Sequence, residues 1–179
     1  MRSGTSMMME ALEAGGLKAV YSRERDKRLN DRWGELNEEV QYLPNERYFE
    51  LSTDDYLSPK FPKAYEGKLI KCLVGGVLRL PPISQYKIIF MRREQSEIVR
   101  SLAAFFGNVE SAAESVSFNA QLDTAIDILR DRRSVVSLHE IWYEDVLTDP
   151  LSVFSSLDWP IDIEKAAAIP QTSKKRSTV

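Results

Sequence analysis

The segment Arg2-Ser3-Gly4-Thr5-Ser6 has the residue types of an anion-binding loop, and it runs directly into a helix-forming stretch. A helix N-terminus exposes unpaired backbone N–H groups and the positive end of the helix dipole, so it suits a phosphate or sulfate. Gly4 lets the backbone approach the anion closely, and Thr5 and Ser6 add hydroxyl donors. Arg2 brings a permanent positive charge to the same place. The segment therefore predicts an anion site.

A second group of candidate residues follows a predicted strand in the middle of the chain. Arg92 and Arg93 leave the C-terminal end of this strand, where open parallel sheets bind their ligands. Ser101 lies about two helical turns further on, and an arginine with a nearby hydroxyl suits a phosphate monoester. The alternative is that the two arginines pair with Glu94 and Glu97 on the surface. Both interpretations remain open from these residues alone.

These candidates require strands and helices to position them. Apolar patterning predicts helices over 3–14, 95–106, 111–130 and about 149–157, and strands over 68–74, 86–91 and 134–141. The near-continuous apolar run at 86–91 is typical of a strand buried on both faces, as in a parallel sheet. Alternating strands and helices predict an α/β fold in three layers, with a mostly parallel sheet flanked by helices.

Apolar spacing also predicts which residues form the core. The first helix is expected to bury Met8, Ala11 and Leu12, and the run of three methionines is interpreted as core packing rather than a metal or cofactor site. In the helix over 111–130, the residues expected to face inward are Val116, Ala120, Leu122, Ile126 and Leu129.

Composition limits the class of protein. The 179 residues fit a single domain over 1–179, with 21–66 as a substrate-side excursion and 171–179 as a flexible tail. The net charge of −3 argues against a general nucleic-acid binder. One cysteine excludes an internal disulfide and fits a reducing compartment, and no apolar run is long enough to span a membrane. We therefore expect a cytoplasmic protein without a membrane span.

Three segments in this order resemble the sulfotransferases that use 3′-phosphoadenosine-5′-phosphosulfate. They are the loop over 2–6, the Arg93 and Ser101 pair after a strand, and Trp142-Tyr143-Glu144-Asp145-Val146. The likeness is greatest to small bacterial or phage-type members, which carry a Pro-Arg-Ser-Gly-Thr-Ser loop and a Phe-Met-Arg-Arg segment. It spans nearly the whole chain and implies a P-loop NTPase-like architecture. The implied activity is sulfuryl transfer to a hydroxyl or amine without a metal ion, with adenosine 3′,5′-bisphosphate as the nucleotide product.

The resemblance also implies roles for individual residues. Arg2, Ser3, Gly4, Thr5 and Ser6 would hold the 5′-phosphosulfate, and Arg2 would stabilise charge on the leaving phosphate. By the same resemblance, Arg93 and Ser101 would bind the 3′-phosphate, and the segment 143–145 would be mainly structural.

The acceptor needs a base, and two residues are candidates. Glu50 closes a segment, 45–50, that looks like the Asn-Pro-x-Gly-Tyr-Phe-Glu segment of bacterial relatives, although the proline and glycine are absent here. Glu50 is equally well interpreted as an exposed loop carboxylate. His139 is the one histidine of the chain, and its place in a predicted strand favours a structural role.

In the family, a hydrophobic strand and a Gly-x-Pro turn precede the phosphosulfate loop, whereas here the loop follows Met1 directly. We therefore expect a gap or an unpaired edge in the sheet. The strand either belongs to a longer natural protein, or is absent, or is supplied by a partner chain. Two alternative functions remain: a catalytically degenerate nucleotide-binding protein of the same fold, and a P-loop kinase-like phosphotransferase. The kinase loop G-x-x-x-x-G-K-[ST] is absent from this sequence.

Overall fold

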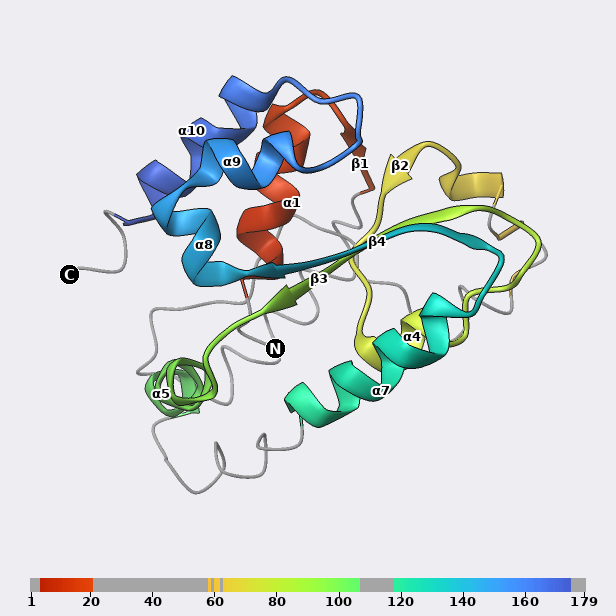
Figure 1. The fold of residues 1–179 in the computed structure, drawn as a ribbon, viewed down its shortest axis with the longest axis horizontal. Helices are drawn as coiled ribbons and strands as arrows, with labels where there is room; N and C mark the ends of the chain where they lie inside the picture. The colour runs from red at the N-terminus through yellow and green to blue at the C-terminus, as the bar shows by residue number, and fades with distance from the viewer. Residues whose placement is uncertain (1–3, 21–57, 59, 62, 107–117, 175–179) are drawn as a thin grey trace.

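The computed structural model describes residues 4–20, 58, 60–61, 63–106 and 118–174. The elements of these residues, labelled in Figure 1, are α1 (Thr5–Ala14), β1 (Lys18–Ala19), the 3-10 turn η1 (Lys63–Tyr65), β2 (Lys68–Leu69), α4 (Val74–Val77), β3 (Tyr86–Arg92), α5 (Gln95–Phe106), α7 (Phe118–Arg130), β4 (Val135–Trp142), α8 (Tyr143–Thr148), α9 (Pro150–Ser155) and α10 (Ile163–Lys174).

Within the described residues, the strands form two small parallel sheets. β3 pairs with β4, with Ile88 opposite Leu138 and Met91 opposite Ile141, and β1 pairs with β2. The connection from β3 to β4 runs through α5 and α7, as parallel pairing requires a crossover. The predicted α/β class with parallel strands is therefore confirmed.

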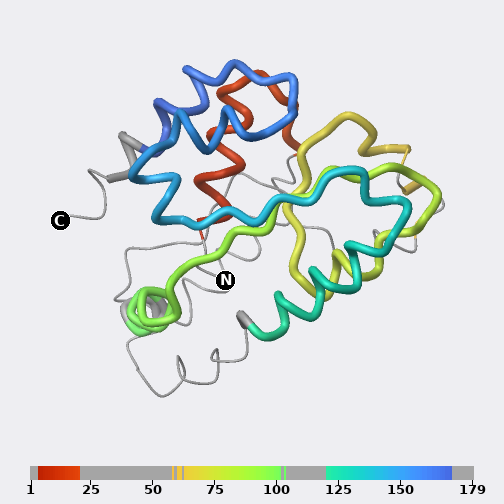
Figure 2. The backbone as a smooth tube through the Cα atoms, in the orientation of Figure 1, coloured from red at the N-terminus to blue at the C-terminus, as the bar shows by residue number. Residues whose placement is uncertain are grey.

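Side chains of β3 alternate between two separate apolar clusters, because successive residues of a strand point to opposite faces. Ile88 and Phe90 pack with the buried residues of α7, which are Leu122, Ala125, Ile126 and Leu129. Ile89 and Met91 pack in the cluster that includes α1, α9 and α10. Figure 2 shows these helices on the side of the strand pair opposite to α7. β3 is thus covered on both faces, as its apolar run predicted.

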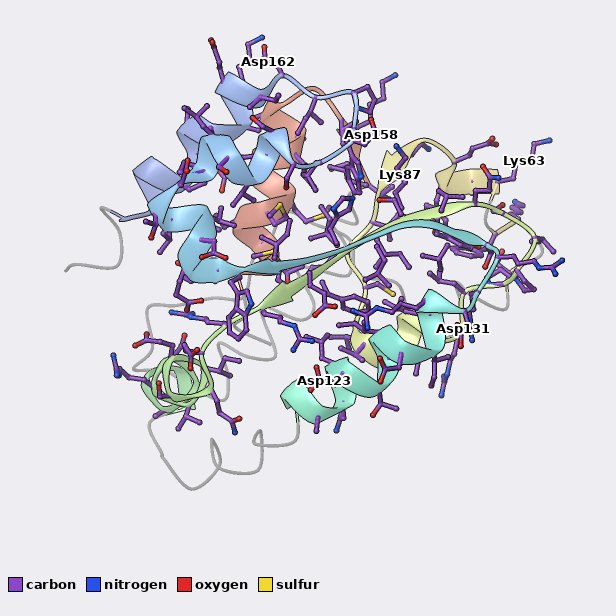
Figure 3. All side chains as sticks on the ribbon, viewed as in Figure 1. Lys63, Lys87, Asp123, Asp131, Asp158 and Asp162 are labelled. Carbon is purple, nitrogen blue, oxygen red and sulfur yellow. The ribbon has the colours of Figure 1, made fainter. Side chains whose placement is uncertain are left out.

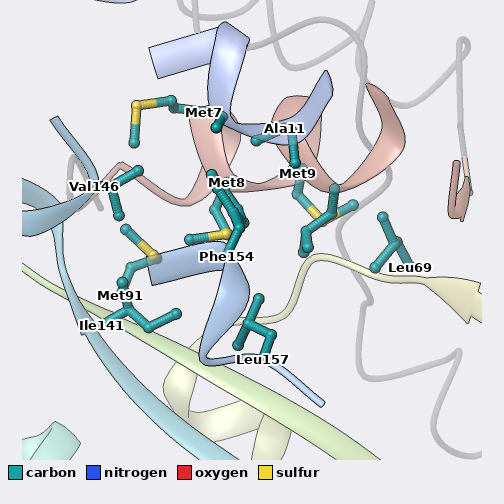
Figure 4. Close-up of a cluster of buried hydrophobic side chains, with 13 residues drawn as sticks. Met7, Met8, Met9, Ala11, Leu69, Met91, Ile141, Val146, Phe154 and Leu157 are labelled. Carbon is teal, nitrogen blue, oxygen red and sulfur yellow. The ribbon is translucent and has the colours of Figure 1, made fainter. Parts of the chain in front are cut away.

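Helix α1 anchors the larger cluster. Met7, Met8 and Met9 are 8%, 3% and 5% exposed, and Ala11 and Leu12 are buried beside them. Figure 4 shows the methionines gathered with Phe154 of α9 and with Met91 and Ile141 of the strands. Flexible thioether side chains fill irregular gaps between helices and a sheet well. The methionine run is core packing, as expected, and it fixes α1 against the strands.

The helices that cover this face have identifiable anchors. Pro150 begins α9, and the Asp149 side chain accepts a hydrogen bond from the Ser152 backbone N–H at 3.1 Å. Lys87 donates a hydrogen bond to the backbone oxygen of Asp158 at 2.7 Å, which ties β3 to the connection between α9 and α10; Figure 3 labels both residues.

Three expectations differ from the structure. The strand expected over 68–74 is limited to β2, and Gly75 lies in the helical turn α4 instead of closing the strand. Among the described residues, Lys68 and Leu69 pair with β1 and the chain is already helical from Val74, so the apolar run alone overstates the strand. In α7, Ala120 is exposed because the buried face runs through Leu122, Ile126 and Leu129, while Val116 lies outside the described residues. α10 continues through Lys174, into the expected tail.

Candidate functional site

The first part of the candidate site is the N-terminus of α1. Gly4 precedes the helix in the left-handed region, at φ 89°, and its backbone oxygen accepts the Met8 N–H at 3.1 Å. Gly4 has no side chain that could cap the helix, and the first turn carries no acidic residue. Thr5 and Ser6 are half-buried at the start of the helix. This end is therefore suited to an anion.

The ring of Tyr143 lies directly against Gly4. A Cβ atom built on Gly4 would meet Cδ2 of Tyr143 at 2.3 Å and Cε2 at 2.9 Å, closer than real Cβ contacts come. Both the positive φ and the approach of the ring therefore require glycine at this position. Tyr143 begins α8, directly after β4, so the end of β4 brings its ring to the start of α1.

Arg93 packs on the same aromatic ring. Its guanidinium carbon lies 4.4 Å from the centroid of the Tyr143 ring, within the range of a cation–π contact. The Arg93 side chain is 17% exposed and forms an ion pair with Glu97 of α5 at 3.5 Å. The end of β3 and the start of α1 therefore converge on one tyrosine.

The neighbouring arginine serves a different purpose. Arg92 points to the α7 side of β3, where its Nε donates to Glu140 at 2.8 Å and its guanidinium also pairs with Asp123. Arg130 of α7 binds the second oxygen of Glu140 at 2.7 Å, and Figure 3 labels Asp123 on α7. Burial lowers the pKa of Arg92, but the hydrogen bonds and charges of Asp123 and Glu140 raise it overall. Arg92 is a structural crosslink between β3, β4 and α7.

These contacts decide part of the question that the sequence left open. The expected pairing of the two arginines with Glu94 and Glu97 holds for Arg93 with Glu97, whereas Arg92 pairs elsewhere. Ser101 lies on α5, four residues after Glu97 and thus on the same helix face, and it is half-buried. The face of α5 that carries Ser101 therefore includes the carboxylate that reaches Arg93.

Several predicted site residues lie outside the described residues, namely Arg2, Ser3 and Glu50. His139 is half-buried on β4, and its Nε2 lies 2.6 Å from the hydroxyl oxygen of Ser137. This pairing within one strand agrees with the structural role favoured for the histidine.

Sequence reasoning missed two features of the segment after β4. It treated 143–145 as mainly structural, although Tyr143 contacts both candidate binding segments. It also did not single out Glu144, whose two carboxylate oxygens are buried and have no hydrogen-bond partner among the described residues. A buried carboxylate without a partner is costly. The order of the motifs in the chain gave no signal for the contacts of Tyr143 or for the burial of Glu144.

The described part of the chain contains no helix that is long and apolar enough to cross a membrane. It also contains no group of three or more His, Cys, Asp or Glu residues that could hold a metal ion.

Comparisons with known proteins provide no relative for this chain. No protein-family model matches it, and neither the curated proteins nor the solved structures include a significant match.

Proposed function

We propose that this chain binds 3′-phosphoadenosine-5′-phosphosulfate and transfers its sulfuryl group to a hydroxyl or amine acceptor. The observation that carries this proposal is the packing of Gly4 and Arg93 on the single ring of Tyr143. It brings together three segments whose order in the sequence resembles the sulfotransferases. The parallel pairing of β3 and β4, with helices on both faces, supports the P-loop NTPase-like architecture that the resemblance implies.

We assign each end of the donor to one part of this arrangement. The N–H groups and dipole of α1, with the hydroxyls of Thr5 and Ser6, would bind the 5′-phosphosulfate. Arg93 would bind the 3′-phosphate with the help of Ser101. A guanidinium that is mostly shielded from solvent favours a doubly charged phosphate strongly, because the interaction is weakly screened there. A site with two such ends would select the 3′-phosphorylated donor over ATP.

The transfer step rests on residues that the resemblance assigns. Arg2 would stabilise the charge that develops on the leaving 5′-phosphate, and Glu50 would take the proton from the acceptor. The acceptor oxygen or nitrogen bonds to sulfur as the bond from sulfur to the phosphate oxygen breaks.

Calorimetry tests the binding half of the proposal. We expect adenosine 3′,5′-bisphosphate to bind well and ATP to bind poorly. Arg93→Ala should weaken bisphosphate binding by about 1.5–3 kcal/mol, the contribution of a charged hydrogen bond. Arg100→Ala is the control, because Arg100 is an arginine seven residues after Arg93, on α5, and its side chain is 73% exposed.

Equal binding of ATP, or a preference for it, would contradict the proposal and favour a kinase-like protein. Binding of the bisphosphate without transfer of labelled sulfate from the donor, across sugar, lipid, peptide and small-molecule acceptors, would favour the degenerate nucleotide-binding protein.

A further inference from the structure

We propose that Tyr143 is a positioning residue, whose ring sets the separation between the Arg93 guanidinium and the N-terminus of α1. The inference rests on the proposed function, in which these two groups bind opposite ends of one ligand. In this role, Tyr143 makes the site prefer ligands with two anionic groups over ligands with one.

The backbone that carries the Tyr143 ring is held in the core. Tyr143 follows Ile141, which is 6% exposed in β4, and precedes Val146, which is fully buried in α8. Both neighbours belong to the apolar cluster that also holds α1 through Met7 and Met8. The backbone that carries the ring and the helix that carries Gly4 are therefore packed into the same core, and a well-packed core resists displacement.

Two groups contact Arg93 and draw it in different directions. The Tyr143 ring lies under its guanidinium, at 4.4 Å from ring centroid to guanidinium carbon, and Glu97 of α5 approaches it at 3.5 Å. Glu97 is itself bound to Arg100 at 2.7 Å, so this carboxylate is anchored on α5. If the ring were lost, the ion pair with Glu97 would still draw Arg93 toward α5, whereas its contact with Tyr143, which also packs against Gly4 at the start of α1, would be gone.

This geometry predicts an effect on two-ended ligands in particular. A ligand that bridges α1 and Arg93 gains affinity only when both subsites are held at the correct separation, because preorganisation lowers the cost of binding. A ligand with a single 5′-phosphate uses α1 and is insensitive to where Arg93 lies. Loss of the ring should therefore reduce the ratio of the two affinities.

The experiment compares Tyr143→Phe, which keeps the ring, with Tyr143→Leu, which removes it. Calorimetry is done with adenosine 3′,5′-bisphosphate and with adenosine 5′-monophosphate. We expect the Phe variant to bind the bisphosphate within about twofold of wild type, and the Leu variant to lose about fivefold to thirtyfold, as expected for a desolvated cation–π contact. Binding of the monophosphate should change by less than about twofold in the Phe variant, and in the Leu variant it should fall by a smaller factor than binding of the bisphosphate, because the ring also packs against Gly4.

A double-mutant cycle separates positioning from a general structural role. In the Arg93→Ala background, Tyr143→Leu should cause a smaller further loss of bisphosphate affinity than it causes in wild type, because the residue that the ring positions is gone. Tyr86→Leu is the matched control, since Tyr86 is a half-buried tyrosine of β3 whose hydroxyl binds the Pro81 carbonyl, and it should leave the ratio of affinities unchanged.

The outcomes distinguish the two proposals. If wild type fails to bind adenosine 3′,5′-bisphosphate, the proposed function is wrong and the positioning role falls with it. Only the positioning role is wrong if wild type binds the bisphosphate and Tyr143→Leu does any of three things: it binds the bisphosphate equally well, it lowers both affinities equally, or it loses as much bisphosphate affinity in the Arg93→Ala background as in wild type.

Discussion

Replacing Gly4 with alanine tests the geometry at the start of α1 most sharply. The new Cβ would lie 2.3 Å from Cδ2 of Tyr143, so either the ring or the helix start must move. At φ 89°, an L-residue also pays about 1–2 kcal/mol for the left-handed conformation. Forcing an extra carbon into a packed site costs about 1–3 kcal/mol more. We therefore expect Gly4→Ala to lower the free energy of unfolding by about 2–5 kcal/mol.

Gly16 offers a matched control at the other end of the same helix. It also has a positive φ, 104°, but a Cβ built on it would meet nothing within 4 Å. Gly16→Ala should therefore cost only the conformational part, about 1–2 kcal/mol. Urea denaturation of both variants gives the two free energies, and their difference isolates the contact between Gly4 and the Tyr143 ring.

The reasoning is refuted if Gly4→Ala is no more destabilising than Gly16→Ala. A second check is the double variant Gly4→Ala with Tyr143→Ala. Removing the ring should recover the steric part of the loss, so the two substitutions should be less than additive.

Three further predictions concern other parts of the molecule. Glu97→Gln removes the carboxylate that competes for Arg93, so calorimetry should show affinity for adenosine 3′,5′-bisphosphate rising by up to about fivefold, the equivalent of about 1 kcal/mol. Glu144→Gln removes a buried charge that has no partner among the described residues, so urea denaturation should show unfolding free energy rising by about 1–3 kcal/mol. Hydrogen bonds from the side chain and backbone of Lys165 lower the pKa of Asp162, so the stability that its carboxylate contributes is present above its ordinary pKa and is lost as pH falls through the lowered one. The difference in unfolding free energy between wild type and Asp162→Ala should therefore shrink as the solution is acidified toward pH 2.

Glu94→Gln is the control for Glu97→Gln and Glu144→Gln, because it makes the same change of charge at an exposed residue near Arg93. It should leave stability nearly unchanged and raise affinity less than Glu97→Gln does. Equal effects of Glu94→Gln and Glu97→Gln on affinity would show that net charge, and not the ion pair, is responsible. A fall in stability of Glu144→Gln, or a pH-independent effect of Asp162→Ala, would contradict the respective predictions.

The sequence predicted the elements whose burial is periodic. Met8, Ala11 and Leu12 recur at helical spacing and form the buried face of α1, and the apolar run of β3 is covered on both sides. The strand expected over 68–74 was overstated because an apolar pattern reports burial but not backbone conformation, and the chain turns into the helix α4 from Val74.

The sequence indicated Gly4 and Arg93 as separate candidates, but it did not predict that Tyr143 brings them together. Gly4 and Arg93 carry local signals, a glycine before a helix and an arginine after a strand. The role of Tyr143 depends on where β4 ends relative to α1, which is a property of the packed sheet and not of local spacing. The sequence pattern does not distinguish Arg92 from Arg93. Successive side chains along the strand point to opposite faces, so Arg92 contacts α7 and Arg93 contacts Tyr143.

A crystal structure of this chain with adenosine 3′,5′-bisphosphate tests the central claim most directly. The account predicts the 5′-phosphate on the backbone N–H groups at the start of α1 and the 3′-phosphate on Arg93, with the Tyr143 ring between Gly4 and the guanidinium. A nucleotide bound elsewhere, or one whose two phosphates contact neither α1 nor Arg93, would contradict it.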